Sequence, residues 1–217
     1  MSKNYGWRIE TNFRDPENNF DRNKVKGKVI RLFTIESDRY ATALEQVAGA
    51  KLFNVVVDNE HTSSMLLQRK CFDHNVYLIP NNKIQGRLLD QRVMKVVQDI
   101  AGNEAKLAIE LIKFDKEFTP TMNFIFGTTL ICNSSEVAKK LAFHPEIRTK
   151  CVNLEGDVFD PSGSLTGGSN IRANSILNKV QEYNLLQDKI KSIKQKNNEL
   201  QNKGRALNEK SKIFEKY

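Results

Sequence analysis

The chain has few of the residues that carry chemistry, and those it has are not grouped. Its 217 residues include three cysteines, three histidines and one tryptophan. No two cysteines have the C-x-x-C spacing of zinc or redox sites, and Cys71 with His74 supplies only two candidate ligands. Scattered cysteines in odd number are typical of a reducing compartment. The sequence therefore predicts an intracellular protein with no metal site and no cofactor.

Long apolar runs are also missing. No stretch approaches the roughly 20 apolar residues that span a bilayer, and the first residues lack the basic-then-apolar order of a signal peptide. With 39% hydrophobic residues the chain can nevertheless bury a core over most of its length. We expect a globular body and no membrane partner.

Positive charge is concentrated towards the C-terminus. The net charge is +8, and residues 172–217 carry 11 lysines and arginines against 5 acidic residues. Such a run is most often the solvated face of a helix, and charge alone favours that interpretation. Clustered basic side chains also bind the phosphate backbone of nucleic acids, so contact with DNA is the alternative.

The body alternates between strand and helix patterns. Strands are predicted at 25–33, 52–57, 76–79, 107–112, 128–132 and 150–154, and helices at 38–48, 62–70, 91–101, 119–127 and 135–143. Asp90 and Gly102 are typical start and stop residues for one of these helices. Both halves follow the same order of elements without shared residue identity. This predicts an α/β fold with mixed sheets and two similar lobes.

An apolar seam follows residue 174. Leu186, Ile193 and Leu200 recur every seven residues, as in a coiled coil. No other segment is long enough to pair with this helix, so we expect one coiled-coil strand in a piece of a longer chain. The predicted organisation is a linker or coil remnant at 1–23, a body at 24–170 with lobes at about 24–103 and 104–170, and the coiled-coil strand at 171–217.

Four glycines lie between residues 156 and 168. Glycine lets a backbone turn tightly or approach another backbone closely. A nucleotide-binding α/β enzyme that uses Gly163–Gly168 as a phosphate cradle is one alternative, but neither G-x-x-x-x-G-K-[ST] nor G-x-G-x-x-G is present. Asp157 and Asp160 are three residues apart, and they are more simply explained by a turn capped by Asp160 than by a metal site. We assign no catalytic residue.

Several ordered motifs together resemble the hinge domain of the structural maintenance of chromosomes (SMC) family. They are DRNKVKG (21–27), YATALE (40–45), VAG (47–49), LFNVVVD (52–58), IPNNKI (79–84), FGTT (126–129) and GDVFDPSGSLTGG (156–168). So many matches in order are far more specific than one glycine motif. The resemblance covers most of the chain, and its detail is closest to condensin.

This resemblance implies a joint and no enzyme, because the ATPase heads of the family lie elsewhere in the long chain. Two arms return from the hinge as an antiparallel coiled coil, and two hinges dimerise. In condensin the partner is the hinge of the fourth-type SMC subunit; whether this chain also forms a homodimer in isolation stays open. The implied interface joins a glycine-rich strand to the partner's other lobe, and we infer the complementary edge at 52–57 from its strand character and matching position. Its expected residues are Gly156, Gly163, Gly167, Gly168, Leu52, Asn54, Val55, Val56 and Val57.

The family also implies non-specific contact with DNA near the coil junction. The basic residues that we assign to it are Arg22, Lys24, Lys26, Arg172, Lys179, Lys189, Lys191, Lys194 and Lys196. No zinc finger, helix-turn-helix or aromatic nucleic-acid stripe is visible, so binding should be salt-sensitive and independent of sequence. The expected location is the nucleus and chromosome, with a cytoplasmic pool.

Overall fold

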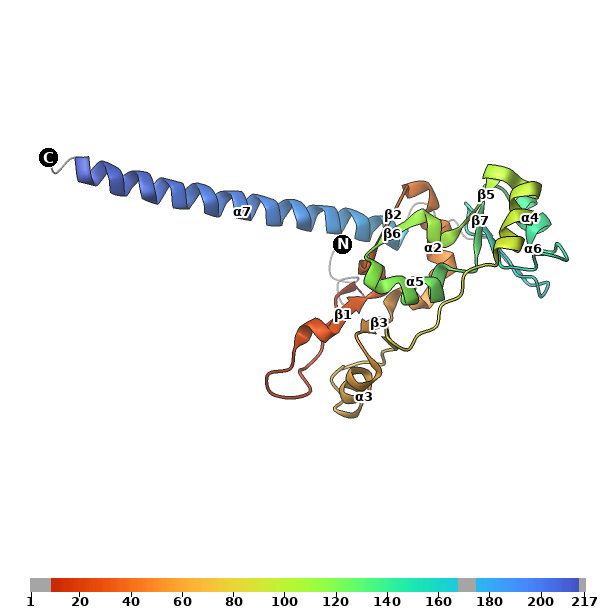
Figure 1. Ribbon diagram of the computed structural model, residues 1–217, viewed down its shortest axis with the longest axis horizontal. Helices are drawn as coiled ribbons and strands as arrows, with labels where there is room; N and C mark the ends of the chain where they lie inside the picture. The colour runs from red at the N-terminus through yellow and green to blue at the C-terminus, as the bar shows by residue number, and fades with distance from the viewer. Residues whose placement is uncertain (1–8, 168–174, 215–217) are drawn as a thin grey trace. The chain divides into compact units, whose positions relative to one another are not determined.

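The computed structural model describes residues 9–167 and 175–214 (Figure 1). Contacts divide the chain into two units, a body that ends at Val180 and a helical unit that starts at Gln181. The body is a mixed α/β structure with several sheets, as predicted. Among the described residues no helix is both long enough and apolar enough to cross a bilayer.

The body contains the same series of elements twice. The first lobe consists of β1 (Val25–Lys28), β2 (Phe33–Ile35), α2 (Ala41–Ala48), β3 (Val55–Val57), α3 (Glu60–Gln68) and β4 (Leu78–Pro80). The second consists of β5 (Ala105–Leu107), β6 (Ile112–Phe114), α5 (Thr119–Phe126), β7 (Leu130–Cys132), α6 (Ser135–Ala142) and β8 (Cys151–Asn153). Helix α4 (Gln91–Ala101) connects the lobes, and a hairpin of β9 (Val158–Phe159) and β10 (Leu165–Thr166) follows β8.

The strands pair by the same scheme in each lobe. One sheet has the order β1-β3-β4 and the other has the order β10-β9-β8-β7-β5. In each, the first strand is antiparallel to the central one and the last strand of the repeat is parallel to it. Strands β2 and β6 form an antiparallel pair that joins the lobes. The second sheet therefore differs from the first mainly by the added β9–β10 hairpin.

Side-chain caps explain why several helices begin where they do. Asp90 accepts a hydrogen bond of 2.8 Å from the Arg92 N–H, and Gly102 ends α4 with φ +52°. Asn59 caps α3 through the Thr62 N–H at 2.9 Å, and Ser134 caps α6 in the same way. Each cap satisfies a backbone donor that the helix leaves unpaired. The predicted start and stop of α4 are confirmed.

One hydrophobic core extends through both lobes. Leu44 and Val56 of the first lobe pack in the same cluster as Leu111 and Phe126 of the second. The rings of Phe33 and Phe126 meet edge to face, with centroids 5.2 Å apart. Smaller clusters lie under α6 and under α3. The lobes are thus repeats of architecture that share a single interior.

Helix α7 (Ile176–Phe214) contains the predicted coiled-coil strand. Its first turn belongs to the body, where Ile176, Leu177 and Val180 are buried in the main core. In the second unit the seam residues Leu186 and Ile193 are exposed. Apolar side chains at a seven-residue spacing that stay exposed are typical of a coiled-coil strand without its mate.

Candidate functional site

Strand β10 is an open edge of the second sheet. Its only strand neighbour among the described residues is β9, and Leu165 opposes Phe159. The Asp160 N–H donates to the Ser164 carbonyl at 3.1 Å, so the next pair, Phe159 and Leu165, exchanges no hydrogen bonds. The N–H and C=O of Leu165 therefore point away from β9. Its side chain is also 62% exposed.

A tight turn precedes this edge. Asp160 accepts from both the backbone N–H and the hydroxyl of Ser162, at 2.9 and 2.6 Å, and these bonds lower the pKa of its carboxyl. The Gly163 N–H donates to the Asp160 carbonyl at 2.9 Å, and Gly163 has φ +100°. The predicted turn capped by Asp160 is confirmed. The turn requires glycine at position 163, because a positive φ strains any residue with a Cβ.

A polar network at the base of the β9–β10 hairpin joins Asn153, Asp157 and Ser135. The Asn153 side chain is buried, donates to Asp157 Oδ2 at 2.8 Å and to Ser135 Oγ at 2.7 Å, and accepts from the Asp157 N–H at 2.7 Å. A Cβ added to Gly167 would lie 2.6 Å from Asp157 Oδ1. Since Asn153 fixes that carboxylate, glycine at 167 lets the end of β10 lie close to it.

The structure places Gly156, an expected interface residue, in a contact within the chain. Gly156 has φ +94°, and a Cβ there would lie 3.1 Å from Thr42 Cγ2 and 3.2 Å from Gln46 Cγ. It is buried against α2 of the same chain. Its role is a close internal contact between the β8–β9 turn and α2. Gly168 lies outside the described residues.

The structure also corrects the predicted edge at 52–57. Strand β3 is the central strand of its sheet, paired with β1 on one side and β4 on the other. Val55, Val56 and Val57 are fully buried, Leu52 is buried in a short 3-10 helix, and the Asn54 carbonyl accepts from Val29. A strand with two neighbours has no edge to offer another chain.

Strands β1 and β4 are the two edges of the first sheet, and β4 is the counterpart of β8 in the second. The Val55 N–H donates to the Tyr77 carbonyl, and the Asn81 N–H donates to the Val57 carbonyl, both at 2.9 Å. Because alternate residues of a strand face opposite neighbours, the N–H and C=O of Leu78 point away from β3. Tyr77 beside it is 77% exposed. Sequence reasoning found this strand but did not choose it, although Pro80 is a residue that sheets accept mainly at edges.

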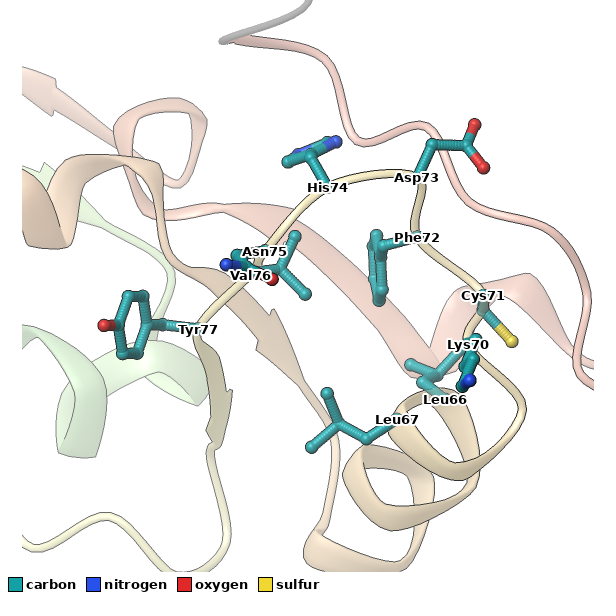
Figure 2. A pocket seen from close by; sticks show the side chains of 10 residues that line it. All are labelled: Leu66, Leu67, Lys70, Cys71, Phe72, Asp73, His74, Asn75, Val76 and Tyr77. Carbon is teal, nitrogen blue, oxygen red and sulfur yellow. The ribbon is translucent and has the colours of Figure 1, made fainter.

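A hollow of about 490 Å³ lies beside this edge, between the end of α3 and the segment that leads into β4 (Figure 2). Figure 2 shows the side chains of Leu67, Phe72 and Val76 directed towards the same space. Leu67 is 54% exposed there. An apolar surface of this kind beside an unpaired strand suits a side chain from a second strand.

The basic residues predicted to contact DNA have different surroundings. Arg22 pairs with Asp15 at 2.7 Å and lies 4.7 Å from the Phe13 ring centroid, and Lys26 pairs with Glu117 at 3.1 Å. The remaining described members are exposed, namely Lys24, Lys179, Lys189, Lys191, Lys194 and Lys196. Arg172 lies outside the described residues. Arg22 and Lys26 are therefore engaged within the body.

Another basic pair was missed by sequence reasoning. Burial, and then the charge of Lys150, lower the pKa of Lys51. Lys51 Nζ also lies 4.5 Å from the ring centroid of Phe124, which is partly exposed. These residues are far apart in the chain, and no local pattern brings them together. The fold concentrates positive charge at a place that the sequence did not indicate.

The geometry does not support the nucleotide-binding alternative. Gly163 and Gly167 flank a hairpin strand, and the next helix among the described residues begins at Ile176. The Ile176 N–H at that helix start already donates to a carboxylate oxygen of Glu45 at 3.0 Å. A phosphate would meet that negative charge rather than free donors. No group of three metal-binding side chains occurs in residues 9–167 and 175–214.

Comparison with known proteins identifies this architecture. The model of the family described as "SMC proteins Flexible Hinge Domain" matches residues 22–142. The chain belongs to the SMC hinge family. It is 44% identical over 187 residues to structural maintenance of chromosomes protein 2 of Saccharomyces cerevisiae and 42% identical over 187 residues to that of Schizosaccharomyces pombe. Each alignment covers 85% of this chain and 16% of the relative.

A solved structure shows the same fold. The crystal structure of an asymmetric dimer of the Geobacillus stearothermophilus SMC hinge domain matches with a TM-score of 0.65 and 26% identity, over 79% of this chain and 69% of that chain. The SMC hinge is a dimerisation module and not a catalytic one. The prediction of a non-enzymatic hinge domain is confirmed.

Proposed function

We propose that this hinge joins two SMC arms by pairing β4 of one chain with β10 of another. The observation that carries the proposal is the unequal number of strands in two otherwise equivalent sheets. In the second lobe β9 and β10 extend the sheet beyond β8, whereas the first sheet stops at β4, the counterpart of β8. A partner's β10 would continue the first sheet, and a two-fold dimer would make this junction twice.

The position of the helices supports an antiparallel junction. Helices α3 and α6 cover equivalent faces of two sheets built by the same scheme. Rotating the second sheet by half a turn in its plane makes β8 antiparallel to β4 and keeps α6 on the same side as α3. Two antiparallel steps separate β8 from β10, so β10 then also lies antiparallel to β4. The helices of both chains cover one face of a continuous sheet.

In the proposed junction Leu165 would contact the first lobe of the partner chain. Leu165 opposes Phe159, which packs in the cluster under α6, so Leu165 belongs to the face that α6 covers. In the antiparallel junction that face continues under α3. Leu165 of the partner then lies beside Leu78 and over the hollow that Leu67 and Val76 line. Main-chain bonds would supply directional pairing, and this side-chain contact would supply selectivity.

We further propose that the natural partner is the hinge of the fourth-type SMC subunit of condensin. The similarity to structural maintenance of chromosomes protein 2 supports this assignment. The chain carries both complementary edges, so it also forms a homodimer when isolated. The complex acts on chromosomes in the nucleus, with a cytoplasmic pool.

Sedimentation equilibrium tests the joint directly. We expect the chain to self-associate alone and to form a one-to-one complex when it is mixed with a fourth-type condensin hinge. A chain that stays monomeric in both conditions would contradict the proposed dimerisation by this domain.

The lysines of α7 are our proposed DNA contact. Lys189, Lys191, Lys194 and Lys196 are exposed and lie within eight residues of one helix. Charges clustered in this way release counterions from the phosphate backbone, so affinity should fall steeply with salt and depend little on base sequence. Arg22 and Lys26 contribute less, because each already pairs with a carboxylate.

Replacing these four lysines with glutamate is expected to flatten the salt dependence. A plot of log K against log salt should lose up to about 0.9 in slope for each phosphate contact removed. Fluorescence anisotropy with duplex DNA measures this. A matched control changes four exposed lysines of the second lobe to glutamate, at 106, 113, 139 and 140. Equal losses in both variants would show that net charge alone matters, and the proposed contact would be wrong.

A further inference from the structure

Helix α7, which we call the arm helix, is held at its start by a carboxylate from the first lobe. Glu45 lies on α2, and its Oε2 accepts from the Ile176 N–H at 3.0 Å and from the Ser175 hydroxyl at 2.9 Å. Ser175 Oγ in turn accepts from the Asn178 N–H at 3.4 Å. One carboxylate oxygen and one hydroxyl thus engage two of the backbone donors that a helix N-terminus leaves unpaired.

Burial and electrostatics strengthen this contact. Ser175 is 3% exposed, and the first turn of α7 packs Ile176, Leu177 and Val180 into the main core. A helix N-terminus carries partial positive charge, which a carboxylate complements. Hydrogen bonds to a charged acceptor are about twice as strong as those between neutral groups. The Glu45 contact is therefore a partly buried, charge-assisted anchor.

Among the residues that the structure describes, the anchor is present in the first lobe and not in the second. Helices α2 and α5 occupy equivalent places in the repeat and begin at Ala41 and Thr119. Counting from these starts, the residue of α5 that corresponds to Glu45 is the neutral Asn123. The arm helix follows the second lobe in the chain, yet it contacts the helix of the first lobe. The two lobes have thus diverged at the residue that holds the arm.

We propose that Glu45 is the positioning residue that fixes the start of the arm helix to the first lobe. Neither the dimer interface nor DNA contact is needed for this role. Helix α2 also contacts Gly156 through Thr42 and Gln46, at the base of the hairpin that carries β10. The same helix therefore touches both the root of the arm and the support of the open edge.

Native-state hydrogen exchange in the full 217-residue chain tests this role. Glu45→Ala is expected to speed exchange of the Ile176 amide and of the rest of the first turn of α7 by at least tenfold relative to the amides of β7. Glu45→Gln should lose less of this protection from exchange, because the glutamine side-chain oxygen still accepts a hydrogen bond. Ser175→Ala should weaken the same turn, since it removes both bonds of the hydroxyl.

Gln46→Ala is the matched control, because it lies on the same helix but faces Gly156. It should leave exchange in the first turn of α7 unchanged relative to β7. The proposal is overturned if Glu45→Ala leaves that exchange unchanged. It is equally overturned if exchange rises uniformly through the body, because Glu45 would then only stabilise the fold.

Discussion

Leu165→Pro is expected to abolish hinge dimerisation while leaving the fold of the body intact. Proline removes the one backbone donor that Leu165 directs outward, and its ring blocks the approach of a second strand. The pairing of β9 with β10 does not use that donor, because Phe159 and Leu165 exchange no hydrogen bonds. A homodimer makes the junction twice, so we expect the dissociation constant to rise by at least about 100-fold, equivalent to about 2.8 kcal/mol.

Two further variants isolate the cause. Leu165→Ala keeps the donor and removes the side chain over the hollow, so it should weaken the dimer without abolishing it. Leu78→Pro removes the corresponding donor from β4 and should match Leu165→Pro. Sedimentation equilibrium measures the association, and circular dichroism checks the fold. A Leu165→Pro variant that dimerises normally while remaining folded would show that β10 is not the joining edge.

The sequence predicted where the strands lie better than it predicted which strands are neighbours in a sheet. Three consecutive valines at 55–57 correctly predicted a strand, but the same run, apolar on both faces, indicates a central strand rather than an edge. Proline at 80 indicated the edge strand β4 instead. Both signals were present in the residues. The strand character and matching position of 52–57 nevertheless favoured β3 as the edge, and the structure shows that both sides of β3 are already paired.

Other features could not be read from local sequence. Strands β9 and β10 have two residues each, too few to show an alternating pattern, and the turn at Asp160 with the Asn153 network defines them. The contact of Glu45 with Ile176 joins residues that are 131 positions apart. Such contacts depend on how the two lobes pack, which no window of sequence contains. Helix α4, in contrast, has its cap, its periodicity and its terminating glycine side by side.

The repeat in the sequence also suggested two lobes without saying whether they are independent. The structure gives a physical answer. Leu44 and Phe33 of the first lobe and Leu111 and Phe126 of the second are buried in one cluster, and β2 pairs with β6 across the boundary. Removing either lobe would expose the apolar surface of the other. We therefore expect the two lobes to unfold in a single cooperative transition.

Phe126→Ala is expected to destabilise both lobes together, by about 3–5 kcal/mol. Phe126 is fully buried and meets the Phe33 ring of the other lobe at 5.2 Å, so its removal leaves a cavity at their shared centre. Urea unfolding followed by circular dichroism and by hydrogen exchange in β3 and β7 measures the loss in each lobe. Phe143→Ala is the control, because Phe143 is 41% exposed and should cost less than about 1 kcal/mol. If β7 lost protection while β3 kept it, the lobes would be separate folding units. Equal loss of protection in β3 and β7 would mean that the two lobes share one core. The edge strands β4 and β10, one on each lobe, would then be held by that same core.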